Sequence, residues 1–146
     1  MDADISALSI NVESGIRMPI IYPGMTDPLV DEAGNEGYLE LLSKDSAPGR
    51  KFFRKLQNTA VKKMWRSGGR LKGLDDEDAV EIEVDKLVVL MTGWHLVTPD
   101  GKAINTPFNE ANVRKVMSLD GMAWLREAAL AFADNAANFT KASSAS

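Results

Sequence analysis

The chain has no cysteine, one histidine and no long apolar run among its 146 residues. Without cysteine it can form no disulfide, no thiol nucleophile and no thiolate metal site. No apolar run approaches the roughly 20 residues that a transmembrane helix needs, so we expect no membrane contact. A single histidine provides no metal-ligand set with the usual spacing. These absences exclude several classes of enzyme.

Short catalytic motifs are also missing. No serine lies in a Gly-x-Ser-x-Gly elbow. The segment Gly68–Gly73 has the glycines and bases of a phosphate loop but lacks the Gly-Lys-Ser/Thr ending, and the acidic run Asp75–Asp78 lacks the ligand spacing of a calcium loop. His95, between Trp94 and Leu96, is more typical of a packed or half-exposed residue than of a base. We therefore predict no enzyme activity, no cofactor and no metal.

Composition indicates a globular protein. Hydrophobic residues make up 45% of the chain and charged residues 26%, which is ordinary for a folded domain. A chain of this length can bury about two-thirds of its unfolded surface and can fold alone. The first ten residues lack the basic segment and apolar core of a secretory signal, so we expect the protein to stay where it is made.

The charges are grouped along the chain although the formal net charge is only −4. The window from Lys44 to Lys72 contains ten basic residues and one acid, Asp45, whereas the window from Asp75 to Asp85 contains seven acids and no base. A basic block can bind nucleic acid. The alternative that we favour is attraction between two consecutive helices of opposite charge.

The first 45 residues predict strands. The segments Ile5–Val12, Ile16–Tyr22 and Gly37–Leu42 are rich in β-branched, aromatic and leucine residues, and glycine- and proline-containing turns separate them. Pro19 lacks an amide hydrogen, so the second of these strands should lie at a sheet edge. A sheet this small is marginal alone and should lean on the helices.

Two long helices should follow. Asp45 or Ser46 can cap the first, and Pro48 lies early enough to be tolerated. Its broad apolar face repeats every four residues through Phe52, Leu56, Ala60 and Met64, with Phe53, Val61 and Trp65 alongside. The glycines after Ser67 should end this helix. The second helix should start at Asp75 and carry Val80, Val84, Leu87, Val88 and Met91, although alternation around Ile82 leaves a strand open.

Beyond the second helix, Gly93 interrupts the apolar run at a possible helix cap, and Trp94, Leu96 and Val97 carry the run on. We predict two helical segments here, joined by the turn Pro99–Lys102. Trp94 should fill a small core. Asn109 should cap a short third helix with Val113, Val116 and Met117 inward. The final helix should bury Leu125, Ala128, Ala129, Phe132, Ala136 and Phe139.

These patterns predict an α+β fold, in which a small N-terminal β-sheet or set of hairpins precedes a mainly α-helical bundle of about four helices. We divide the chain into a β-rich segment at 1–45, a helical domain at 46–140 and a flexible tail at 141–146. Seven large apolar residues are candidates for binding another chain: Phe52, Leu56, Met64, Trp65, Trp94, Trp124 and Phe132.

The order of these pieces resembles the tail assembly chaperones of long-tailed bacteriophages. The resemblance covers Gly37 to Phe139 and depends on a series of segments: Gly37–Ser46, the basic helix ending near Trp65, the acidic helix running into Thr92-Gly93-Trp94, Asp100-Gly101, Pro107–Asn112, Trp124–Glu127 and Ala137–Phe139. The β-like N-terminus and the His95-Leu96-Val97 stretch are not part of the family pattern.

The resemblance implies a protein without catalytic activity in the cytoplasm of the infected bacterium. It would bind the long tape measure protein, keep it soluble and help recruit tail tube subunits, and self-association is a further expectation. A helix docked in an adaptable apolar groove, with methionines among the contacts, would suit such a client. The alternative is a structural component of the virion tail or head-tail connector, with the N-terminus as an assembly arm. Nucleic acid is the third alternative.

Overall fold

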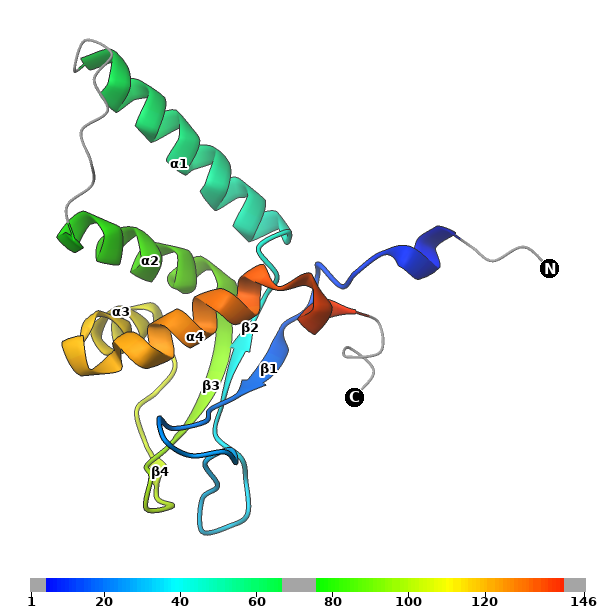
Figure 1. Cartoon of the computed structure of the whole chain (residues 1–146), viewed down its shortest axis with the longest axis vertical. Coiled ribbons are helices and arrows are strands. Elements are labelled where there is room, and N and C mark those ends of the chain that lie inside the picture. The colour runs from blue at the N-terminus through cyan, green and yellow to red at the C-terminus, as the bar shows by residue number, and fades with distance from the viewer. Residues whose placement is uncertain (1–4, 67–75, 141–146) are drawn as a thin grey trace.

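The structure is a computed structural model that describes residues 5–66 and 76–140, with the side chains of 60–66 and 76–77 left out. Its centre is a four-stranded antiparallel sheet in the order β1-β2-β3-β4 (Figure 1). The strands are β1 (Ile16–Pro19), β2 (Tyr38–Leu41), β3 (Met91–Val97) and β4 (Ala103–Ile104). Four α-helices accompany the sheet, which confirms the predicted α+β class.

Two of the predicted strands are present, and the third is not. β1 lies at the sheet edge, as Pro19 predicted, and pairs with β2. The segment around Ile5 is instead a short 3-10 helix, η1 (Ile5–Leu8), without a buried residue. Its apolar residues therefore have no sheet to join, and the strand prediction for Ile5–Val12 was wrong.

The prediction of helical chain at Met91–Val97 was also wrong, because this segment is strand β3. It pairs with β2 on one side, through Trp94 opposite Leu39 and His95 opposite Tyr38, and with β4 on the other. β3 and β4 thus bring two strands from the range 46–140 into the sheet. A local irregularity next to Glu40 adjusts the register between β2 and β3.

The helices α2 (Asp76–Leu90), α3 (Glu110–Ser118) and α4 (Ala123–Asp134) enclose the core with one face of the sheet. The core combines residues from both sources: Met18, Leu39, Leu41, Met91 and Leu96 from the strands, and Val84, Leu87, Val113, Met117, Leu125 and Ala129 from the helices. Short 3-10 helices, η2 (Asp120–Met122) and η3 (Ala136–Phe139), flank α4. None of the described helices combines the length and hydropathy required to span a bilayer.

The third and fourth helices follow the sequence pattern closely. Asn109 caps α3, because its side-chain oxygen accepts a hydrogen bond from the amide of Asn112 at 2.8 Å. Val113 and Met117 are buried as predicted. In the final helix Leu125 and Ala129 are buried, whereas Ala128 is exposed and the α-helix ends before Ala136.

The first helix, α1 (Ala47–Arg66), differs from the other three. Figure 1 shows it leaving the body near the ends of β2 and α2 and pointing away from the remaining helices. The predicted end of this helix at Ser67–Gly69 and the predicted cap of α2 at Asp75 lie outside the described residues. The α2 segment itself is helical, which resolves the open choice between helix and strand.

Candidate functional site

α1 begins in a tight buried turn. The buried Ser46 hydroxyl accepts a hydrogen bond from the Gly49 amide at 3.3 Å, so Ser46 is the N-cap. Gly49 lies so close to the preceding chain that an added Cβ would be 2.2 Å from the carbonyl oxygen of Lys44. Any side chain at this position would displace the backbone. The turn therefore fixes the direction in which α1 leaves the body.

The base of α1 is held by backbone hydrogen bonds to two other helices. The Leu42 amide donates to the carbonyl of Leu90 at 2.8 Å, at the end of α2, and the Lys44 amide donates to the carbonyl of Ala133 at 3.0 Å, near the end of α4. Leu42, Leu90 and Ala133 also form a small apolar cluster of their own. α1 is thus anchored at one end by a packed base.

Beyond this base, α1 does not bury its apolar side chains. Phe53 is 59% exposed, and Phe52 and Leu56 are only half-buried. From Ala47 to Thr59, Gly49 is the one buried residue, and no residue of this range belongs to either core cluster. A helix in a globular protein usually packs its apolar face against the core. The described half of α1 leaves that face largely in solvent.

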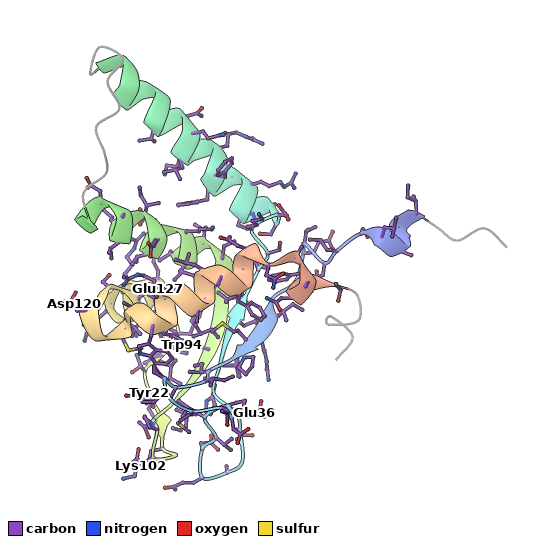
Figure 2. The ribbon with its side chains drawn as sticks, in the orientation of Figure 1. Tyr22, Glu36, Trp94, Lys102, Asp120 and Glu127 are labelled. Atoms are coloured by element: carbon purple, nitrogen blue, oxygen red, sulfur yellow. The ribbon has the colours of Figure 1, made fainter. Side chains whose placement is uncertain are left out.

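Helical spacing places Arg50 and Lys55 at the two edges of the apolar face, with Lys51 and Arg54 further round the helix. Arg50, Lys51, Arg54 and Lys55 are all exposed, and none of them forms an ion pair with an acid in the described part of the chain. We use the term α1 surface for these four bases together with the three apolar residues Phe52, Phe53 and Leu56. Figure 2 shows side chains projecting from the part of α1 that lies nearer the body.

Two of the described acids of α2 form ion pairs with helices other than α1. Asp85 pairs with Arg114 of α3 at 2.6 Å, and Glu83 pairs with Arg126 of α4 at 3.1 Å. Arg126 is buried and also donates to the carbonyl of Met117 at 2.8 Å. These two acids therefore attach α2 to α3 and α4, and the described bases of α1, Arg50 to Lys55, have no ion pair with a described acid.

The seven predicted binding residues lie in two separate places. Phe52 and Leu56 belong to the α1 surface. Met64 and Trp65 are on α1 as well, but their side chains lie outside the described part of the structure. The other three pack against the core cluster; they are Trp94 on β3 and Trp124 and Phe132 on α4.

The two described tryptophans are held by specific partners. Trp94 contacts Phe108 edge-to-face at a centroid distance of 5.4 Å, and its indole nitrogen donates to the carbonyl of Thr106 at 3.0 Å. Trp124 contacts Tyr22 in the same manner at 5.5 Å. Figure 2 places Trp94 and Tyr22 below α4, far from α1. Trp94 thus has the core-filling position predicted for it.

The more exposed of the two described aromatic residues of α1, Phe53, was not among the candidate binding residues chosen from the sequence. Phe53 lies beside Phe52 in the apolar face, yet the four-residue repeat through Phe52, Leu56 and Met64 drew attention to their side of the helix. The bases Arg50 and Arg54 were assigned to a face that α2 would neutralise. The adjacent Phe52-Phe53 pair was the available signal, since two neighbouring large apolar residues make a helix face too wide for one narrow contact.

A second candidate site is the open face of the sheet, opposite the core. A shallow pocket of about 440 Å³ lies there, lined by Arg17, Pro19, Asn35, Glu36, Tyr38, Trp94 and His95. The Arg17 guanidinium lies over the Tyr38 ring at 4.1 Å and 3.8 Å from the Glu40 carboxylate. Figure 2 shows Glu36 at the loop beside the sheet. The pocket is polar and open to solvent.

His95 is committed to a partner in this pocket. Its Nε2 lies 2.8 Å from the carboxylate of Asp31, and its side chain is partly exposed, as predicted. The amide of Asn35 and the His95 side chain both lower the pKa of Asp31. Asp31 also accepts a hydrogen bond from the Ala33 amide at 2.9 Å, within its own loop. The contact between Asp31 and His95 therefore attaches this loop to β3. The described residues include no group of three or more side chains that could hold a metal ion.

Comparison with known proteins gives no match: no protein-family model, curated protein or solved structure is significantly similar to this chain. The functional argument therefore depends on the two surfaces described above. The polar pocket is occupied by its own internal contacts around His95. The α1 surface combines exposed apolar groups with unpaired charge, which is the chemistry of a protein-binding surface.

Proposed function

We propose that this protein is a phage tail assembly chaperone, which binds the tape measure protein, keeps it soluble and helps recruit tail tube subunits. The observation that carries the proposal is the α1 surface, where Phe53 is 59% exposed on a helix anchored only at its base. A long helical client must cover its apolar stripe before assembly, and a projecting amphipathic helix offers the complementary face. The order of sequence elements from Gly37 to Phe139 supports the same function.

The proposed role involves no chemical transformation and takes place in the host cytoplasm. Binding would use apolar contacts along α1, while the sheet and the helices α2, α3 and α4 hold its base in position. Exposed apolar area on a folded chain commonly marks an interaction site. Here that area lies on α1, whose residues from 47 to 59 belong to neither core cluster.

The test is co-expression with the tape measure protein encoded in the same phage genome. We expect a soluble complex that co-elutes in size-exclusion chromatography, whereas the tape measure protein expressed alone should aggregate. The Phe53→Ser variant should lose the complex, and Ile104→Ser, which changes an exposed residue of β4 instead, should keep it. An insoluble client in the presence of the wild-type protein would contradict the proposal.

A structural component of the virion is the second candidate, because one observation favours it. The segment containing η1 extends away from the body in Figure 1, and its Ile5 and Leu8 are 83% and 85% exposed. Its inner end is tied to the body by the Asn11 amide, which donates to the carbonyl of Phe139 at 2.7 Å. An arm of this kind can join subunits. Mass spectrometry of purified particles separates the two functions, because an assembly chaperone should be absent from them.

A further inference from the structure

We propose that the α1 surface recognises an acidic amphipathic helix, whose apolar stripe lies on Phe52, Phe53 and Leu56 and whose acids face the flanking bases. This inference rests on the proposed function and specifies the chemistry of the client segment. It starts from a charge imbalance within α1. The helix carries seven bases and no acid; the bases are Arg50, Lys51, Arg54, Lys55, Lys62, Lys63 and Arg66.

The spacing of these bases makes the imbalance unfavourable for an isolated helix. Arg50 and Arg54 are four residues apart, as are Lys51 and Lys55, so each pair places like charges on adjacent turns. The first turn also lacks the acids that would complement the helix dipole. A partner with acidic side chains would relieve both effects. A partner with basic side chains would increase them.

No acid of the same chain performs this role in the described structure. Two described acids of α2, Glu83 and Asp85, are already paired with arginines of α4 and α3. The apolar residues of α1 are likewise left without a core to enter. Both halves of an amphipathic binding surface are thus present and unoccupied, and their arrangement defines the complementary charge.

The shape of α1 favours a helix over nucleic acid or a membrane as the partner. A helix of 20 residues extends for about 30 Å, which matches a client helix of similar length. Proteins that bind single strands use a charged groove that follows the backbone. A projecting helix with Phe52, Phe53 and Leu56 on a convex surface offers no such groove. The chain outside α1 is acidic, with 21 acids against 10 bases, so a broad anionic surface would be repelled there.

The test uses two designed helical peptides that share the same leucine stripe and differ only in their flanking residues, glutamate in one and lysine in the other. Binding to the full chain is measured by fluorescence anisotropy at low and high salt. We expect the glutamate peptide to bind at least about tenfold more tightly than the lysine peptide, with a preference that shrinks at high salt. Equal binding of the two peptides would overturn the inference.

Matched variants connect the preference to α1. The double variant Arg50→Glu, Arg54→Glu should reverse the peptide preference, and Phe53→Ser should weaken both peptides by at least about tenfold. Lys102→Glu is the charge control, because Figure 2 shows Lys102 at the opposite end of the molecule from α1. Circular dichroism checks that each variant is folded. If Lys102→Glu changes the peptide preference as much as the α1 variants do, the assignment of the site to α1 is contradicted.

Two further measurements separate the possible failures. In the first, vesicles of phosphatidylglycerol or a single-stranded DNA oligonucleotide replace the peptide. If the wild-type protein binds either one and the double variant Arg50→Glu, Arg54→Glu does not, the choice of a helical partner is overturned. The tape measure protein is then tested with the same variant. If wild type and charge-reversed protein hold it equally well, the acidic-helix inference fails while the proposed function stands. If wild type does not hold it but the peptide preference is present, the proposed function fails alone.

Discussion

Replacing two phenylalanines by alanine, one at a time, tests whether α1 contributes to folding. Phe53 on α1 is 59% exposed, and Phe139 in η3 is fully buried. The aromatic ring of Phe139 contacts Phe132 edge-to-face at 5.6 Å. The two substitutions remove the same atoms, so a difference in the free energy of unfolding reports the difference in burial.

The expected magnitudes differ severalfold. Full burial of a phenylalanine side chain contributes about 1.5–3 kcal/mol, and Phe53 buries roughly two-fifths of that area, or about 0.6–1.2 kcal/mol. Alanine restores about 0.5 kcal/mol of helix propensity, so Phe53→Ala should cost less than about 0.7 kcal/mol. Phe139→Ala should cost about 3–5 kcal/mol, because it leaves a cavity and removes the aromatic pair.

Urea unfolding, followed by circular dichroism and tryptophan fluorescence, measures both values. The titrations are made at two protein concentrations, because association through α1 would make the apparent stability of wild type depend on concentration. A cost above about 2 kcal/mol for Phe53→Ala at both concentrations would refute the reasoning, since it would mean that the α1 face is packed inside the monomer.

Three more measurements test the internal contacts. Arg126→Ala should destabilise the fold by about 2–4 kcal/mol, because it leaves the Met117 carbonyl without this donor and Glu83 without its partner; Glu83→Gln should cost less, because Glu83 is partly exposed. Asn109→Ala should lower stability by about 1 kcal/mol through loss of the α3 cap, measured by urea unfolding. The pKa of Asp31 lies below its ordinary value of 3.8, so its stabilising contribution is complete above that pH and is lost as the pH falls through the folded-state pKa. In His95→Ala, NMR titration should find the pKa of Asp31 above its wild-type value but still below 3.8, because the hydrogen bond from the Asn35 amide remains.

Several elements were predictable because a local interaction determines them. Pro19 has no amide hydrogen to donate to a neighbouring strand, so its strand was expected at a sheet edge, where β1 lies. Ser46 and Asn109 precede helices whose first amides need acceptors, and both are the observed caps. Each of these signals lies within a few residues of the structure that it determines.

β3 was not predictable in the same way. The apolar run from α2 continues through Met91 without a strong breaker, so local pattern favoured more helix. What makes the segment a strand is its pairing with β2, about 50 residues earlier, which places Trp94 beside Leu39. Helix and strand patterns both put apolar residues inward, and only the position of the distant partner decides between them.

The position of α1 illustrates a similar limit and explains why its surface is the better candidate. An apolar repeat predicts that a helix has a face to cover, but it does not identify what covers it. The opposite charges of α1 and α2 suggested that these helices cover each other, yet Arg114 and Arg126 are closer partners for the acids of α2. Arg126 satisfies a buried carbonyl as well as a carboxylate, a combination that an exposed base on α1 cannot provide. In the described part of α1, the bases from Arg50 to Lys55 have no ion pair with a described acid, and the apolar face beside them is largely exposed. Both features support the proposed partner outside the chain.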